Sequence, residues 1–384
     1  MIENNIETDG LFYYKSEFFI KNMFQKTVLR KPVDFLAVQG YFRIPFFMIT
    51  PNGTLICGSE CRYGGGSDYQ MSDIVLKYSY DNGKTWINPL KAIANNNVFN
   101  TNIAHGSRVV NPCVLVTENR IYLFASKIDD ETALSYYGVV LTAPDFFSYF
   151  GFIYSDDNGL TWSAYQDLSA LKTVNTNLLT ASPSSKGLVL ENGTLVVPVL
   201  DHRHSANEVD AGIDWGIRCA LVYSIDNGAN WLMSNEIPRF TDESTIVEYE
   251  PNKIMLIDRE LTTNAGCWIT DDLGATWTKH VNDRKIYNAP CQMSIEKYIF
   301  EGVKKYLFTT PMTNTPNRQN VRLRISDDLI SWRDCFQLWQ PFCNGYTCLF
   351  SDKKNGNIFF VLETGTDIVI FNLFGFKENI ILEF

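Results

Sequence analysis

The chain has 384 residues, which is long enough for two domains or for one large all-β domain such as a propeller. Its formal net charge of −10 at pH 7 argues against a nucleic-acid-binding protein, because neutralising phosphates requires a surplus of lysine and arginine. Aromatic residues make up 14% of the chain, including 26 Phe and 19 Tyr, and this composition favours strands over helices.

Membrane and metal proteins are also disfavoured. No segment approaches the roughly 20 apolar residues of a membrane helix, and the acidic N-terminus lacks the apolar core of a secretory signal. We therefore expect no membrane span, and a cytoplasmic protein as the sequence stands or a secreted one if a leader has been removed. The nine cysteines lack CxxC spacing, and the DHRH pair at 201–204 lacks a matching ligand set, so we expect buried thiols and no metal site.

The first clear strand pattern is YFRIPFFMIT, residues 41–50. Two of its residues disfavour a plain core strand. The cation of Arg43 is costly to bury without a partner, and Pro45 removes a hydrogen-bond donor from the ladder. We infer that Arg43 has a specific partner.

A repeated turn motif follows along the chain. SYDNGKTW (79–86), SDDNGLTW (155–162), SIDNGANW (224–231) and TDDLGATW (270–277) share the pattern Ser/Thr-x-Asp-x-Gly-x-x-Trp, and SDDLISW (326–332) is a shortened copy. The shortened copy lacks the glycine. Each full copy has the chemistry of a hairpin turn, in which glycine takes a positive φ, the aspartate caps amides and the tryptophan packs back. We assign these Asp boxes a structural role.

The segments between the boxes complete an all-β pattern. A β-rich run precedes each box, and NG-type hairpin turns occur at 51–54, 191–194 and 353–357. The strongest helical pattern, at 163–174, predicts at most a short helix in a loop. The intervals between boxes leave room for one four-stranded sheet per repeat, so the sequence predicts a β-propeller. No linker divides it, so we expect a single domain over residues 1–384.

Arg43 in FRIP (42–45), followed by Asp boxes, resembles the sialidase (neuraminidase) family, and the resemblance extends from about Phe42 to Phe374. The segment SRVVNPCVLV (107–116) is similar to the trypanosomal sialidase and trans-sialidase branch. This resemblance implies a six-bladed propeller with four-stranded antiparallel blades and no attached lectin module. It also implies an exo-α-sialidase that retains anomeric configuration, acts on sialylated glycans and needs no cofactor or metal.

The resemblance also implies the binding residues. Three arginines would hold the carboxylate of sialic acid, because a planar guanidinium binds a carboxylate in bidentate fashion. They correspond to Arg43, to Arg259 after a catalytic glutamate, and to Arg318 before the last box. Arg322 and Arg324 are alternatives for the third arginine, but they alternate along a strand as solvent-facing residues would.

The catalytic groups follow in the same way. Tyr346 in NGYTCLF would be the nucleophile, with Glu243 as the base that takes its proton, and Asp68 in the glycine-rich loop would be the acid and base. The surrounding candidates are Arg62 near the 4-hydroxyl of the sugar, Glu363 as the partner of Arg43, and Arg108 with Asn111 near the N-acetyl group. Part of the family has aspartate where this chain has Asn111.

Three alternative functions remain open. A trans-sialidase would transfer the sialyl group to a sugar acceptor, but the tryptophan expected two residues before Arg318 is replaced by Pro316. A lectin would bind sialic acid without cleaving it, but Tyr346 and Asp68 are both retained. A scaffolding propeller would leave the FRIP and tyrosine motifs unexplained.

Overall fold

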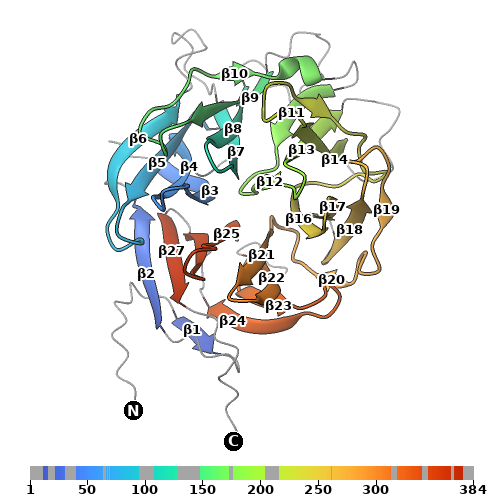
Figure 1. Ribbon diagram of the computed structural model, residues 1–384. Coiled ribbons are helices and arrows are strands. Elements are labelled where there is room, and N and C mark those ends of the chain that lie inside the picture. Colours follow the sequence, from blue (N-terminus) through green and yellow to red (C-terminus); the bar gives the residue numbers. More distant parts are fainter. Residues whose placement is uncertain are drawn as a thin grey trace, which may run out of the picture.

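The computed structural model describes residues 12–15, 22–30, 40–63, 66, 68, 70–94, 108–128, 148–172, 176–203, 216–260, 262–312, 318–339, 345–364 and 367–374. The described strands form antiparallel sheets arranged in a ring (Figure 1). Five hydrogen-bonded sheets are present, and the largest has eight strands. That sheet is two blades joined by the single parallel bridge between Ser72 and Arg108. The ring therefore has six blades, as predicted.

The blades follow the chain in order. Blades 1 and 2 comprise β3 (Gly40–Ile49), β4 (Leu55–Tyr63), β5 (Ser72–Ser79) and β6 (Ile87–Ile93), then β7 (Arg108–Val116), β8 (Ile121–Ile128), β9 (Ser148–Ser155) and β10 (Gln166–Asp167). Blade 3 comprises β11 (Thr176–Ala181), β12 (Leu188–Val189), β13 (Leu195–Arg203), β14 (Ile217–Ser224) and β15 (Leu232–Met233). The short helix η3 (Ser169–Leu171) lies between blades 2 and 3, within the segment where the sequence predicts at most a short helix.

The remaining blades include strands from the start of the chain. Blade 4 comprises β16 (Ser244–Glu250), β17 (Lys253–Asp258), β18 (Asn264–Thr270), β19 (Thr278–Lys279) and β20 (Ile286–Tyr287). Blade 5 comprises β21 (Ser294–Phe300), β22 (Val303–Pro311), β23 (Val321–Ser326) and β24 (Arg333–Trp339), with β1 (Phe12–Lys15) paired to β24. Blade 6 comprises β25 (Thr347–Ser351), β26 (Ile358–Thr364) and β27 (Asp367–Phe374), with β2 (Asn22–Leu29) paired to β27. The pairing of β2 with β27 closes the ring (Figure 1).

The Asp boxes join the third strand of a blade to its outer edge, as in the turn after β5. The Ser79 hydroxyl accepts a hydrogen bond from Gly83 N at 2.8 Å, and the Asp81 carboxylate accepts one from Thr85 N at 2.9 Å. Gly83 has a φ of 88°, which costs glycine little because it has no Cβ. Each box is therefore a rigid turn, which agrees with the structural role predicted for it.

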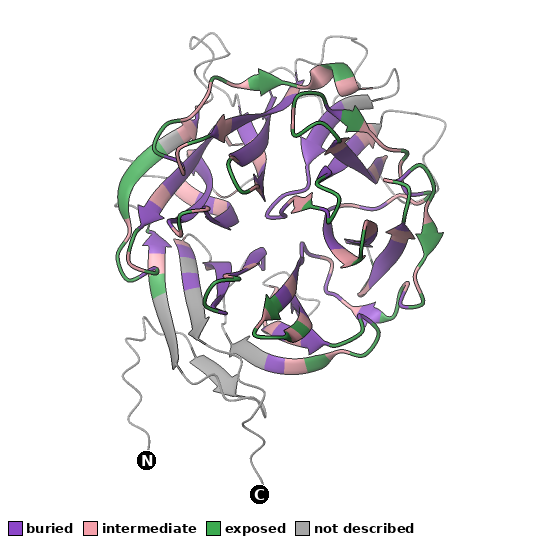
Figure 2. Cartoon of the chain, viewed as in Figure 1, coloured by how far each residue is buried: buried purple, intermediate pink, exposed green. Residues whose placement is uncertain are grey.

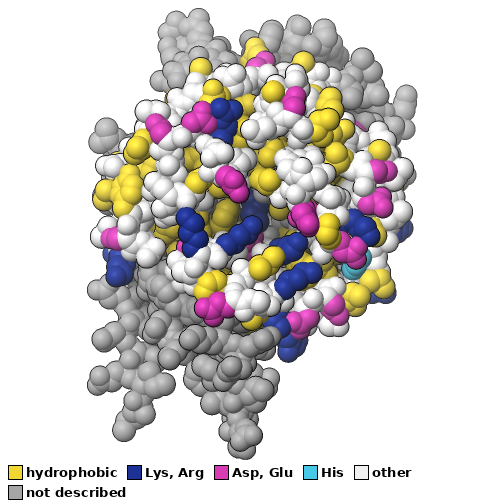
Figure 3. Space-filling model, viewed as in Figure 1, with side chains coloured by type: hydrophobic (Ala, Val, Ile, Leu, Met, Phe, Trp, Pro, Cys, Tyr) yellow, Lys and Arg dark blue, Asp and Glu magenta, His cyan; other side chains and the backbone are white. Residues whose placement is uncertain are grey.

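Burial follows the radial position of the strands. The inner strands and the strands behind them are mostly buried, whereas exposed residues concentrate in the turns and at the rim (Figure 2). Every described cysteine is buried, as the sequence predicts. Viewed along the ring axis, the surface is hollowed at its centre, with basic and acidic side chains intermingled around the hollow (Figure 3).

Polar side chains bridge neighbouring blades at every interface of the ring. The inner strands of adjacent blades do not share a continuous ladder, so their facing backbone groups need other partners. Buried side chains provide them through these hydrogen bonds: Ser72 to Val109 O, Ser126 to Leu179 O, Ser182 to Ser244 O, Ile295 N to Thr245, Leu349 N to Ser294, and Ile44 N to Glu363. These bridges connect the blades close to the axis.

Candidate active site

The candidate residues meet where the inner strands begin. Arg43 lies in β3, Glu243 directly precedes β16, Tyr346 directly precedes β25, and Arg259 directly follows β17. Side chains from β3 and from the ends of β16, β17 and β25 contact one another at one place in the ring. Residues that are hundreds of positions apart in the sequence are therefore neighbours.

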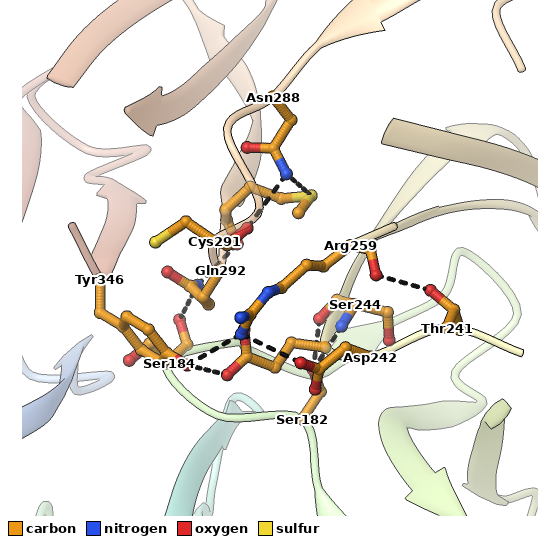
Figure 4. A network of polar contacts seen from close by, with 12 residues as sticks. Ser182, Ser184, Thr241, Asp242, Ser244, Arg259, Asn288, Cys291, Gln292 and Tyr346 are labelled. Atoms are coloured by element: carbon orange, nitrogen blue, oxygen red, sulfur yellow. Dashed lines mark hydrogen bonds and ion pairs between the residues drawn. The ribbon is translucent and has the colours of Figure 1, made fainter. Parts of the chain in front are cut away.

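The side chain of Tyr346 points toward Arg259 in this cluster (Figure 4). Its hydroxyl donates a hydrogen bond to Glu243 Oε1 and accepts one from Arg259 Nη1 at 3.2 Å. The guanidinium carbons of Arg43 and Arg318 each lie 5.4 Å from the centroid of the tyrosine ring. Burial and the carboxylate of Glu243 raise the pKa of the phenol well above its ordinary value, against the lowering effect of Arg259 and Arg318. The phenol is therefore protonated and hydrogen-bonded directly to a carboxylate.

Glu243 shares a guanidinium with its neighbour. Arg259 Nη1 contacts Glu243 Oε2 at 2.6 Å and Asp242 Oδ2 at 3.1 Å. Burial raises the pKa of Glu243, the Arg259 guanidinium lowers it, and Asp242 raises it further, so the net shift is upward. A carboxylate with a raised pKa is a stronger base than an ordinary glutamate, and this one faces a phenol.

Arg43 has the partner predicted for it. Its Nε donates to Glu363 Oε2 at 2.7 Å, and the same oxygen accepts a hydrogen bond from Ile44 N at 3.0 Å. Glu363 Oε1 accepts a hydrogen bond from Tyr346 N at 3.2 Å. Burial lowers the pKa of Arg43, but Glu363 more than compensates and raises it. The fully buried carboxylate therefore fixes both Arg43 and the start of the tyrosine segment.

The FRIP segment contains a β-bulge. The register between β3 and β4 shifts between Arg43 and Phe46, and Ile44 has a φ of 58°. A positive φ is unusual for a β-branched residue and costs free energy. The bulge turns the Ile44 amide toward Glu363 instead of the ladder, and Pro45 occupies a position that needs no ladder donor. This is the physical reason why an arginine and a proline share one strand.

Asp68 lies in a second group of charges beside the first. Arg62 Nη1 contacts Asp68 Oδ1 at 2.6 Å and donates to Gly66 O at 2.8 Å, and Arg108 Nη1 donates to the main-chain oxygen of Asp68. Desolvation opposes ionisation of Asp68, but Arg62 and then Arg43 lower its pKa below the ordinary value. Its side chain is 65% exposed, so the carboxylate can reach a molecule outside the protein.

Asn111 lies in the wall next to this group. Its Nδ2 donates to Thr180 Oγ1 at 3.1 Å, and Thr180 Oγ1 lies 3.4 Å from His202 Nε2. Its backbone N donates to Glu60 Oε1 at 2.8 Å. Burial lowers the pKa of His202 to about 4, so this imidazole is neutral at pH 7. The wall beside Asn111 therefore contains neutral polar groups.

The structure supports Arg318 over the two arginines of β23. Arg318 lies against the Tyr346 ring, whereas Arg322 and Arg324 lie beside Asp334 of β24. Gly345 allows this approach, because a Cβ there would lie 2.9 Å from Arg318 Cβ and its φ is 84°. Pro316, which stands where a trans-sialidase would have tryptophan, lies outside the described residues.

Several residues of the site have no motif in the sequence. Glu60 is fully buried, holds Arg62 Nε at 2.8 Å and has its pKa raised by burial. Its only sequence signal is its position two residues before Arg62 on one strand face. Cys291 packs with Ile44 and Tyr346, and burial raises the pKa of its thiol to about 11.

The described part of the chain contains no group of three or more His, Cys, Asp or Glu residues arranged to hold a metal ion. It also contains no helix with the length and apolar character needed to cross a membrane.

The ring of blades, the Asp boxes and the arginine-lined tyrosine together define a sialidase-like β-propeller. Residues 47–330 match the family described as the BNR repeat-like domain, and the chain therefore belongs to that family. The family and fold predicted from the FRIP motif and the Asp boxes are confirmed.

The similar proteins are sialidases. A sialidase of Clostridium perfringens is 28% identical over 362 residues, which cover 85% of this chain and 87% of that protein. The structure of the Hadza microbial sialidase Hz136 has a TM-score of 0.77 at 24% identity and covers 90% of this chain and 68% of that one. A Trypanosoma rangeli sialidase in complex with 2,3-difluorosialic acid, described as a covalent intermediate, has a TM-score of 0.70 at 20% identity and covers 87% of this chain and 54% of that one.

Proposed function

We propose that this protein is a retaining exo-α-sialidase that removes terminal sialic acid from glycoconjugates and works as a single propeller domain. The observation that carries the proposal is the hydroxyl of Tyr346, which is hydrogen-bonded to Glu243 and lies among three arginines. The extended similarity to a bacterial sialidase supports it. No other described tyrosine combines a carboxylate base with this surplus of cations.

Recognition begins with the carboxylate of sialic acid. Arg43, Arg259 and Arg318 surround the tyrosine ring, and their guanidinium groups offer paired donors to a planar anion. Glu363 and Glu243 hold two of these arginines before substrate arrives, which reduces the entropy lost on binding. The substrate carboxylate would then lie beside the phenol, with the anomeric carbon within its reach.

The covalent step uses the tyrosine and its base. Tyr346 Oη attacks the anomeric carbon as its proton passes to Glu243, and the bond from that carbon to the leaving oxygen breaks. A neutral phenol approaches an anionic substrate with less repulsion than a carboxylate nucleophile does, and a tyrosine nucleophile is the recognised exception for sialidases among glycosidases. In the second step water attacks the same carbon, the bond from that carbon to Tyr346 Oη breaks, and the proton returns from Glu243 to the tyrosine oxygen.

Asp68 serves the leaving group and then the water. An acid must be protonated to donate, whereas Arg62 and Arg43 hold the pKa of Asp68 low in the protein without substrate. The substrate carboxylate would neutralise part of this positive field, so binding itself raises the pKa of Asp68. Asp68 then protonates the leaving oxygen, and as a carboxylate it takes a proton from the attacking water. Because the Asp68 side chain is largely exposed, its carboxyl group can contact both the leaving oxygen and the attacking water.

The surrounding polar groups complete the pocket. We assign Arg62 to the hydroxyl groups of the ring, because it already anchors Asp68 and is held by Glu60. Arg108 and Asn111 lie on the adjacent wall, which suits the N-acetyl group. The amide of Asn111 in place of a carboxylate leaves this wall with one negative charge fewer.

The test is a fluorogenic α-sialoside assay on the wild type, Tyr346→Phe and Asp68→Ala. We expect release of the fluorophore by the wild type and a fall in kcat of at least about a thousandfold for Tyr346→Phe, because the nucleophile is lost. Nuclear magnetic resonance of the first product should show the α-anomer. A wild type that binds sialic acid without cleaving it would be a lectin. Sialyllactose formation from added lactose would identify a transferase.

A further inference from the structure

One buried segment connects the start of β16, next to Glu243, with the start of β25, next to Tyr346. Residues 182–187 follow β11 and lie at the axis of the ring, where Ser182, Ser184 and Ser185 are all fully buried. Ser184 N donates to Pro112 O at 3.2 Å, and Gly187 N donates to Val114 O at 2.6 Å, so the segment also contacts β7. We call residues 182–187 the axial segment.

Ser182 connects the axial segment to the residue after Glu243. Its hydroxyl donates to Ser244 O at 2.6 Å and accepts from Ser244 N at 2.7 Å (Figure 4). On its other side the backbone of Glu243 is held by Arg259, whose N donates to Glu243 O at 2.7 Å. The main chain at Glu243 is therefore fixed from two directions, one of which depends on a single hydroxyl.

Gln292 connects the axial segment to the residue after Tyr346. Its Oε1 accepts from Thr347 N at 2.9 Å, while its Nε2 donates to Met293 O at 2.6 Å and to Ser184 O at 3.3 Å. The side chain is fully buried. A buried amide with these three partners has little freedom to move, so it also restricts Thr347.

We propose that Ser182 and Gln292 are positioning residues that set the distance between the Glu243 carboxylate and the Tyr346 hydroxyl. Each acts on the residue that directly follows one member of the pair, and both are attached to the axial segment. The inference rests on the proposed function, in which Glu243 takes the proton of Tyr346. A displacement of about 1 Å between reacting groups can lower a rate about a hundredfold.

The chain provides two matched controls. Ser126 makes the same kind of bridge, with its hydroxyl 3.0 Å from Leu179 O, but it joins blades 2 and 3 and does not contact the catalytic pair. Ser185 lies on the axial segment, and its buried hydroxyl has no hydrogen-bond partner. The first control reports the loss of a bridge between blades, and the second reports the loss of a buried hydroxyl from the same segment.

The experiment compares Ser182→Ala, Gln292→Met, Ser126→Ala and Ser185→Ala with the wild type. We expect kcat on the fluorogenic sialoside to fall ten- to a hundredfold for Ser182→Ala and Gln292→Met, with KM within about twofold of the wild-type value. The rate of covalent inactivation by 2,3-difluorosialic acid should fall in parallel, because it measures the attack of Tyr346. Both controls should keep wild-type kcat, and thermal unfolding should show that Ser126→Ala and Ser182→Ala both destabilise the fold.

Three results would overturn the inference. They are wild-type kcat in both test variants, an equal loss of kcat in Ser126→Ala, and a loss carried by KM instead of kcat. If Ser182→Ala does not fold, Gln292→Met provides the same test at the other member of the pair. A wild type without sialidase activity would instead overturn the proposed function, and this outcome is separate because it is measured before any variant.

Discussion

Replacing Arg43 with lysine separates charge from geometry at the candidate site. The guanidinium of Arg43 directs Nε to Glu363 at 2.7 Å and leaves its other nitrogens near Tyr346, and only 14% of the side chain is exposed. Lysine keeps the positive charge but has a single ammonium group on a flexible stem. That group can contact Glu363 or a substrate carboxylate, but it cannot form a bidentate pair with one while it bonds the other.

The expected cost follows from the hydrogen bonds lost. A hydrogen bond to a charged group contributes roughly 1.5–3 kcal/mol. The Arg43→Lys substitution removes about two such hydrogen bonds from the substrate-bound state, and the lysine ammonium restores part of one of them. A net loss of about 3 kcal/mol in transition-state binding corresponds to a fall of roughly a hundredfold in kcat/KM. The free energy of unfolding should fall less, by about 1–2 kcal/mol, because the ammonium can still pair with Glu363.

The assay is kcat/KM on a fluorogenic sialoside, with denaturant unfolding in parallel. Arg120→Lys is the matched control. Arg120 also makes a bidentate pair, with its Nε 2.6 Å and its Nη2 2.9 Å from the carboxylate of Asp156, but it lies outside the site. We expect it to keep wild-type kcat/KM. An Arg43→Lys variant with wild-type kcat/KM would show that the fork geometry of Arg43 plays no part in binding.

Three other predictions concern pKa shifts and backbone geometry. Burial raises the pKa of Asp258 from 3.8 to about 6, so the folded state binds this proton more tightly than the unfolded state does. The free energy of unfolding should therefore fall by up to about 3 kcal/mol as the pH rises from 4 to 6. Denaturant unfolding across this range should show the fall in the wild type, and its persistence in Asp258→Asn would assign it to another group. Because burial raises the pKa of Glu243 above 4.5, the acidic limb of the kcat/KM profile for the sialoside should lie above pH 4.5, and a limb below that value would contradict its role as base. Gly345→Ala should destabilise the fold and lower kcat by more than Gly193→Ala does: both glycines have positive φ, but only at Gly345 does a Cβ meet other atoms, the nearest at 2.8 Å. Equal effects on thermal unfolding and activity would refute this reasoning.

Local chemistry made much of the fold predictable. An Asp box determines its own turn, because its serine or threonine, aspartate and glycine satisfy one another within a few residues. Five such turns, each after a β-rich run, indicate a repeated sheet, and the blades follow. That Arg43 needs an anionic partner could also be predicted, because a buried cation requires a buried anion, whereas Glu363 as that partner was implied only by the resemblance to sialidases.

The other residues of the site depended on contacts that leave no local pattern. Glu60 resembles any strand glutamate, yet it accepts hydrogen bonds from the Arg62 side chain and from the backbone N–H of Asn111. Ser182 resembles any loop serine, yet it bridges blades 3 and 4 beside Glu243. Such residues satisfy backbone groups that the ring geometry leaves unpaired, and that geometry is a property of the assembled blades.

The turns, the repeated sheets and the kinds of charged group available for an anion follow from local sequence. Which of those groups meet depends on how the blades assemble. The side chains of Arg43 and Glu363 are 320 positions apart and contact each other because the ring closes between blades 6 and 1. Hydrogen bonds within a turn depend on neighbouring residues, whereas the distance between the Glu243 carboxylate and the Tyr346 hydroxyl depends on how all six blades pack around the axis.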